Sequence, residues 1–217
     1  MPAHCYPDVW QAFHARPETL DCSQRNYPQW HKGRPYYYFI GLLLDDEPQQ
    51  QLMACCRQNL ADLLLQPYTR QPHLTIYPCG FLTPQAHHND DITTDDIARL
   101  YRRIQALALP SLQLQSHAVN SFAEAPFIEI SSGGNALGRL CTQLRQFRSD
   151  FRQTPFTPHL TIGMYRKAWP VADVIPRLQQ LPVQPLAWQT QNLQLLRYRA
   201  DDTGSAIELC ETIPLRG

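Results

Sequence analysis

The strongest constraint on the fold is a tetrapeptide that occurs twice. The residues His-Leu-Thr-Ile stand at 73–76 and again at 159–162, so the two histidines are 86 positions apart. A Phe-Ile pair precedes each copy, at Phe39 and at Phe127, by 34 and 32 residues. This period is too long for a solenoid and is typical of two halves of one domain. We therefore expect two related lobes whose repeated segments face each other.

Each copy of the tetrapeptide divides into a polar and an apolar face if it forms a strand. His73 and Thr75 then point to one side and the two aliphatic residues to the other, and His159 and Thr161 repeat this arrangement. Two such strands, brought together across a pseudo-twofold axis, place two imidazoles and two hydroxyls on opposite walls of one cleft. This combination of groups indicates a site for a phosphate.

Composition narrows the class of protein. A chain of 217 residues with 43% hydrophobic and 18% charged residues can bury a sizeable core. The formal net charge is zero, so bulk charge does not hold this protein on a long polyanion, and any contact with nucleic acid must be local. We find no apolar run near the ~20 residues of a membrane span and no signal peptide at residues 1–4. Seven cysteines without CxxC spacing indicate reduced thiols, and together these features predict a cytoplasmic protein.

Hydrophobic periodicity and turn residues predict the elements in chain order. We expect strands over 36–44, 112–122, 188–199 and 206–213, with further strands at both motifs and from residue 127, and helices over about 48–66, 93–107, from 135, and over 171–181. Loops are expected at 78–91 and 201–204, and Thr93 and Asp96 have the spacing of a capping box. The fold class is therefore α+β: two pseudo-symmetric lobes, about 36–122 and 127–215, each an antiparallel-rich sheet with outer helices, and a cleft between them.

Residues 1–35 lie outside the repeat and are expected to form an irregular arm or lid. This arm is aromatic and basic, and it contains Tyr27, Trp30 and Arg34. In one interpretation the arm is a strap whose Trp30 packs on the core. In the other, Trp30 or Tyr27 stacks on a base while Arg34 meets a phosphate. The two interpretations are compatible, and we favour the strap.

The paired His-x-Thr-x motifs resemble those of the 2H phosphoesterases. The likeness runs from about Phe39 to Leu215 and includes Phe122 and Gly204. Within that superfamily the chain is most similar to the bacterial 2'-5' RNA ligase-like proteins, also described as RNA 2',3'-cyclic phosphodiesterases. The resemblance implies that His73 is the proton donor and His159 the proton acceptor. The residues alone leave this assignment open, because the two motifs are chemically equivalent.

Cleavage of a cyclic phosphodiester needs a base, an acid and hydrogen-bond donors for the phosphoryl oxygens. Histidine serves both proton roles near neutral pH. The hydroxyls of Thr75 and Thr161 can donate to the phosphate, and the chemistry needs no metal or other cofactor. Tyr77, Tyr165 and Arg166 follow the motifs closely and are candidates for binding phosphate or base, with simple packing as the alternative.

The leading hypothesis is a metal-independent phosphodiesterase that acts on RNA ends with 2',3'-cyclic phosphates or on cyclic nucleotides. One alternative is RNA 2'-5' ligation, which is the same step in reverse. Another is a nucleotide- or RNA-binding protein without turnover. The intact His and Thr residues in both motifs make this alternative less favoured. The expected partner is an RNA terminus or cyclic nucleotide, with no membrane and no obligate protein partner.

Two further groups of residues receive a structural interpretation. His87 and His88 are adjacent in a polar loop and have no fixed third ligand, so a metal site there is not expected. Arginines surround the helix that precedes the second motif and are interpreted as a solvated face: Arg139, Arg145, Arg148 and Arg152.

Overall fold

Two apolar strands lie at the centre of the molecule because they are buried on both faces. A computed structural model describes residues 4–23, 28–147 and 155–215. In it, β1 (Tyr36–Leu43) and β2 (His73–Leu82) are buried along most of their length and pair in antiparallel orientation. A nearly continuous apolar sequence is typical of strands covered on both sides. β2 extends to Leu82, so the loop expected from residue 78 begins later.

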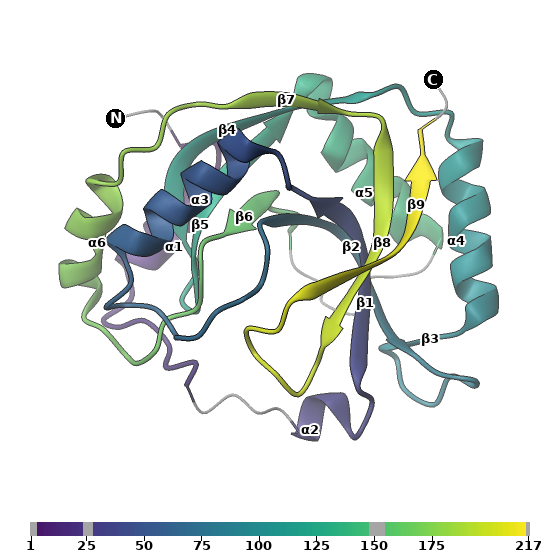
Figure 1. The fold of residues 1–217 in the computed structure, drawn as a ribbon, viewed down its shortest axis with the longest axis horizontal. Helices are drawn as coiled ribbons and strands as arrows, with labels where there is room; N and C mark the ends of the chain where they lie inside the picture. Colours follow the sequence, from purple (N-terminus) through teal and green to yellow (C-terminus); the bar gives the residue numbers. More distant parts are fainter. Residues whose placement is uncertain (1–3, 24–27, 148–154, 216–217) are drawn as a thin grey trace.

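The remaining strands extend one sheet to both sides of this centre (Figure 1). Their order is β7-β4-β5-β6-β2-β1-β8-β9, and β3 pairs in parallel with the end of β2, whereas the other pairs are antiparallel. The α+β class with an antiparallel-rich sheet is confirmed, and the two motif strands, β2 and β6, are neighbours. The bounds are β3 (Asp91–Ile92), β4 (Leu112–Ser121), β5 (Pro126–Ser132), β6 (His159–Thr161), β7 (Ala187–Thr190), β8 (Asn192–Arg199) and β9 (Ile207–Pro214).

Each side of the sheet contains strands from both of the expected sequence lobes. β4 was expected in the first lobe, but it pairs with β5 and β7 on the side of the second motif. β8 and β9 lie beyond β1, on the side of the first motif. A tight turn, in which the Phe122 amide donates to the Ala125 carbonyl at 3.0 Å, joins β4 to β5 as neighbours. The sheet therefore divides differently from the sequence repeat.

The strand expected over 188–199 consists of two strands with different partners. β7 pairs with β4 at one edge, and β8 pairs with β1 on the other side of the centre. The Thr190 hydroxyl accepts from the Asn192 amide at 3.2 Å and donates to the Asn192 carbonyl at 2.9 Å, which bends the chain between them. Figure 1 shows β7 along the top of the molecule and the chain turning from its end down into β8. Residue periodicity alone cannot reveal a change of partner within an extended segment.

Five of the helices that the structure describes, α1 and α3 to α6, pack against the main core. The capping box of α4 is confirmed: Thr93 Oγ1 accepts from the Asp96 amide, and Asp96 accepts from the Thr93 amide. None of the helices in the described ranges has the length and apolarity that a membrane crossing needs. Two short helices, α1 and α2, occur in the arm that was expected to be irregular, and α3 ends before the expected residue 66. The bounds are α1 (Pro7–His14), α2 (Pro28–His31), α3 (Glu47–Asn59), α4 (Thr94–Ala106), α5 (Ala136–Phe147), α6 (Val171–Gln179) and the 3-10 helix Gly133–Asn135.

A second, smaller apolar layer lies apart from the main core. It consists of two clusters around Phe39 and Tyr37, with Leu196, Ile207, Phe81 and Ala200 as their other buried members. Register places Phe39 opposite Leu196 and Tyr37 opposite Tyr198 across β1 and β8. Side chains directly opposite in antiparallel strands share a face, so these aromatic rings lie together on the sheet.

Candidate active site

The four motif side chains meet at the junction of β2 and β6. These strands pair where the two motif leucines oppose each other, and both leucines are buried in the helix-side core. In an antiparallel pair the flanking residues then oppose as well, with His73 across from Thr161 and Thr75 across from His159. These four side chains lie on the face opposite the leucines. They form a square with the imidazoles on one diagonal and the hydroxyls on the other.

The backbone orients both imidazoles in the same way. His73 Nδ1 lies 2.9 Å from the Gln71 carbonyl, and His159 Nδ1 lies 2.7 Å from the Thr157 carbonyl. A carbonyl only accepts hydrogen bonds, so Nδ1 carries the hydrogen in each ring. In the neutral form, Nε2 is then the nitrogen that can accept a proton. Each imidazole is held by the carbonyl two residues before it, which leaves Nε2 as the reactive atom.

Phenylalanine rings support the two imidazoles. The Phe39 ring lies 5.6 Å from the His73 ring, and the Phe127 ring lies 5.1 Å from the His159 ring, each tilted by 56°. These two phenylalanines belong to the Phe-Ile pairs that accompany the motifs in the sequence. Phe122 adds an edge contact to His159 at 5.1 Å. The repeat thus preserves the support of each histidine as well as the histidine itself.

Charge and burial around His73 favour its neutral form. Burial, and then the positive charge of Arg70, lower the pKa of His73 to about 3, and His159 and Arg57 act in the same direction. The hydrogen bond from Nδ1 to the Gln71 carbonyl opposes this shift without cancelling it. His73 is therefore neutral at physiological pH in the protein alone. The same positive charges suit an anionic ligand beside it.

A pocket of about 240 Å³ lies beside His159 and Thr75, and it includes an arginine that the sequence interpretation assigned to a solvated face. Arg145 comes from α5 on the helix side and lines this pocket, where it is half-buried. The position of Arg145 on the helix before the second motif is the only sequence signal for this role. Arg148 and Arg152 lie outside the described residues. The lining is Thr75, Phe122, Arg145, Pro155, Phe156, Thr157 and His159.

The residues that follow the motifs are not brought to the square of motif side chains. Tyr77 is buried in the core, where an irregularity between β1 and β2 interrupts the alternation of faces. Tyr165 is fully buried, and its hydroxyl is 2.8 Å from the Ser121 hydroxyl. Arg166 is exposed on the loop after β6, beside Trp169.

Trp30 packs as the strap interpretation predicts. Its ring lies 5.1 Å from Tyr37 and 5.0 Å from Phe81, and it belongs to the smaller apolar layer. The ring is therefore engaged by the protein. Tyr27, the other aromatic residue considered for stacking on a base, lies outside the described residues.

Arg34 is engaged by two carboxylates. It forms ion pairs with Asp90, at 2.7 Å, and with Asp91. Asp91 also accepts hydrogen bonds from the backbone amides of His87 and His88 at 2.8 Å each. This network ties the arm to the loop between β2 and β3. Within the described residues, no group of three or more His, Cys, Asp or Glu side chains could hold a metal ion.

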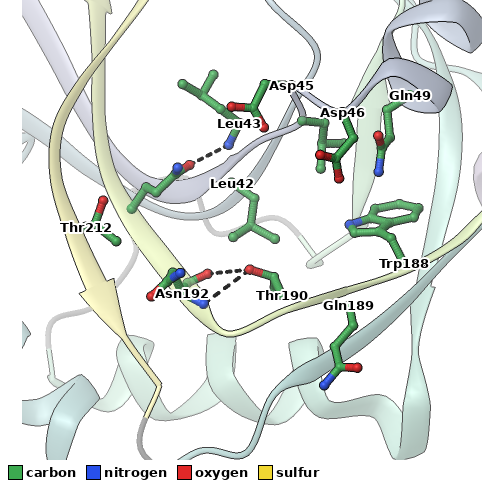
Figure 2. A pocket seen from close by; sticks show the side chains of 12 residues that line it. Leu42, Leu43, Asp45, Asp46, Gln49, Trp188, Gln189, Thr190, Asn192 and Thr212 are labelled. Carbon is green, nitrogen blue, oxygen red and sulfur yellow. Dashed lines mark hydrogen bonds between the residues drawn. The ribbon is translucent and has the colours of Figure 1, made fainter.

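Another pocket, of about 250 Å³, lies at the end of β1, beside the β7–β8 connection. Figure 2 shows Asp45 and Asp46 there together with Gln49, Trp188 and Thr190. Two carboxylates repel an anionic ligand. The pocket of the motif residues is lined by an arginine and a histidine instead, so it is the better candidate site for an anionic ligand.

Comparison with known proteins agrees with this geometry. The model of the 2'-5' RNA ligase superfamily matches residues 44–202, which include both motifs. The chain belongs to the 2'-5' RNA ligase superfamily. This superfamily is part of the 2H phosphoesterases, as the sequence resemblance implied. The first 43 residues lie outside the match, and no curated protein matches the chain.

Solved structures share the fold of this superfamily member. TT0787 of Thermus thermophilus is 17% identical with a TM-score of 0.55, and the match covers 83% of this chain and 98% of TT0787. E. coli LigT complexed with NADP+ is 15% identical with a TM-score of 0.54, over 85% of this chain and 100% of LigT. E. coli LigT complexed with 3'-AMP is 13% identical with a TM-score of 0.54, and the match covers 84% of this chain and 99% of LigT.

Proposed function

We propose that this chain is a metal-independent phosphodiesterase that opens 2',3'-cyclic phosphates at RNA ends or in nucleotides. The observation that carries the proposal is the pair of imidazoles, each with its Nδ1 hydrogen donated to the backbone. An acid and a base of this kind are what the reaction needs. Solved complexes of LigT with 3'-AMP and NADP+ support a phosphate-bearing nucleotide as the ligand.

The proposed step uses both motifs at once. Water attacks the phosphorus while one imidazole accepts a proton from that water. The bond from phosphorus to one ribose oxygen breaks, and the other imidazole donates a proton to that oxygen, which leaves a phosphomonoester. Resemblance to the family implies His73 as donor and His159 as acceptor. The hydroxyls of Thr75 and Thr161 donate to the phosphoryl oxygens, where negative charge increases in the transition state.

We assign a supporting role in the same step to Arg145. It lines the pocket that contains His159 and Thr75, and its guanidinium is permanently charged. A cation at this position stabilises the phosphoryl group more strongly than a neutral hydroxyl can. Arg70 supplies positive charge near His73, as its effect on the pKa of His73 requires.

The test is turnover of 2',3'-cyclic nucleotides and of short RNAs with a cyclic phosphate end, in excess chelator. We expect turnover by the natural protein, and at least about a 100-fold loss of kcat in His73→Gln and in His159→Gln, because each proton role contributes on the order of 10²–10⁴-fold. Circular dichroism of both variants controls for folding. Full activity in either variant would contradict the mechanism, as would a rate that chelator abolishes and a divalent ion restores.

The superfamily description favours one second candidate, formation of a 2'-5' linkage. The same groups serve this reaction when a 5'-hydroxyl of RNA replaces water as the nucleophile. The hydroxyl loses its proton to one imidazole and attacks the phosphorus. The bond from phosphorus to the 3'-oxygen breaks, and the other imidazole protonates that oxygen, which leaves a 2'-5' phosphodiester. Incubation of an RNA with a cyclic phosphate end and a second RNA with a 5'-hydroxyl distinguishes ligation from hydrolysis. A joined product would establish ligation, and hydrolysis alone would exclude it under those conditions.

A further inference from the structure

A second hollow lies next to the pocket of His159, along α5. It has a volume of about 550 Å³ and shares Arg145 and Phe156 with that pocket. Pro158, which precedes His159, also lines it. The two hollows therefore adjoin each other, and we use the word channel for their combined lining. The second hollow is lined by Tyr6, Asn135, Gly138, Arg139, Thr142, Gln143, Arg145, Phe156 and Pro158.

One wall of the channel is a polar stripe of α5. Gly138, Thr142 and Arg145 are spaced by three or four residues and share one side of the helix, with Arg139 beside them. The opposite side of α5 is buried in the main core through its leucines. The stripe presents two guanidinium groups, and the described residues that line the two hollows include no carboxylate. This wall thus presents positively charged groups to the channel.

Tyr6, from the N-terminal segment, also lines the second hollow. The Tyr6 hydroxyl donates to the Ile130 carbonyl at 2.7 Å, and Asn120 Nδ2 donates to the Tyr6 carbonyl at 3.1 Å. Next to Tyr6, the Cys5 amide donates to Glu129 Oε2 at 2.7 Å. Tyr6 is therefore fixed against the edge of the channel. It lies outside residues 44–202, the range that matches the superfamily.

We propose that the channel binds the nucleotides that precede the cyclic phosphate, so that an oligoribonucleotide end is a better substrate than a cyclic mononucleotide. The proposal rests on the proposed function of the motif site. Each preceding phosphodiester carries one negative charge, which Arg139 neutralises. Tyr6 and Phe156 offer aromatic rings against which bases stack, the combination typical of single-strand binding. A zero net charge is compatible with this contact because the charge acts locally.

The experiment compares substrates of increasing length that end in the same cyclic phosphate. The ladder runs from the cyclic mononucleotide to the tetranucleotide, with the natural protein, Arg139→Gln and Arg102→Gln. Arg102 is an exposed arginine on the neighbouring α4 that lines neither hollow, so it is the matched control. We expect kcat/KM to rise by about tenfold or more with length. Arg139→Gln should remove most of this rise through KM and leave mononucleotide turnover within twofold, while Arg102→Gln changes neither.

Equal kcat/KM at all lengths in the natural protein would overturn the proposal, as would an equal loss for short and long substrates in Arg139→Gln. Fluorescence anisotropy with the same ladder, ending in a non-cyclic 3'-phosphate, separates the channel from the chemistry. If longer RNA binds more tightly, and if Arg139→Gln abolishes this gain in affinity, the proposed binding channel is supported even when no turnover is seen. In that case only the proposed enzyme function would be refuted. An affinity that does not depend on the length of the RNA would overturn the proposal that the channel binds the preceding nucleotides.

Discussion

At the scale of single residues, the neutrality of His73 determines how a phosphate can bind. Burial, followed by the charge of Arg70, lowers its pKa in the protein alone. An anion between the two imidazoles acts in the opposite direction, because an opposite charge favours the protonated form. If His73 is the donor, it must therefore acquire its proton as the anion binds.

Binding of sulfate, which does not titrate in this range, should take up protons at pH 6 to 7. Calorimetry in two buffers with different ionisation enthalpies measures this uptake, and we expect up to one proton per site. His73→Gln should abolish the uptake, whereas His117→Gln, which changes a histidine bonded to Ser131, should retain it. An uptake of zero in the natural protein would mean that His73 stays neutral and would assign it the acceptor role instead.

The same pKa shift predicts a stability change at acid pH. The unfolded state protonates His73 near pH 6.5, but the folded state does so only near pH 3, so protonation favours unfolding between these values. Above pH 6.5, His73 is neutral in both states and its protonation does not affect the free energy of unfolding. On acidification from pH 7 to 4.5, the natural protein should lose more stability than His73→Gln, by at most about 1.4 kcal/mol per pH unit. Urea unfolding at both pH values measures this, and equal losses would contradict the shift.

At the scale of elements, α2 fastens the arm to the motif half of the sheet. Trp30 packs on Tyr37 and Phe81, and the guanidinium of Arg34 lies 3.8 Å from the centre of the Phe81 ring. The ion pairs of Arg34 fix the same segment to the loop after β2. These contacts give the arm a packing role that does not require a ligand.

Trp30→Ala should lower the melting temperature and leave KM unchanged. The ring is half-buried, so the loss is expected to be about 2 kcal/mol, below the 3–5 kcal/mol typical of a core tryptophan. Differential scanning calorimetry and steady-state kinetics on a cyclic nucleotide give the two readouts. His88→Ala, on the exposed loop nearby, is the control. A raised KM with unchanged stability would instead favour stacking on a base.

At the scale of the whole molecule, the site lies where the two sides of the sheet join. One motif comes from β2 and the other from β6, and the pairing of these strands brings the two histidines together. Both histidines serve one proposed chemical step, so their contributions cannot be independent. Because the proposed step is distributed over the two sides, we expect that neither motif suffices alone.

The double variant His73→Gln with His159→Gln should lose about as much kcat as the more damaged single variant. Groups that act as a unit show this lack of additivity. Single-turnover rates of all three variants on a dinucleotide that ends in a 2',3'-cyclic phosphate measure this lack of additivity. Losses that multiply across the two sites would argue for separate roles in separate steps.

The sequence by itself determined the features that depend on neighbouring residues. The spacing within each motif placed the histidine and threonine on one face of a strand and the aliphatic residues on the other, because strand geometry has a period of two. The Thr93 cap and the apolar centre at β1 follow from equally local rules. The superfamily could be inferred at this level because its motifs are short and contiguous.

Only the tertiary structure decided which distant segments meet. It divided residues 188–199 between two sides of the sheet, turned Tyr77 into the core at an irregularity, and brought Arg145 to the motif pocket. It also brought Tyr6 and α5 to the lining of one hollow. Each of these outcomes depends on strand partners and helix packing over long sequence separations, whereas alternation and capping report only on neighbouring residues. The motif side chains were therefore predictable, and the walls around them were not.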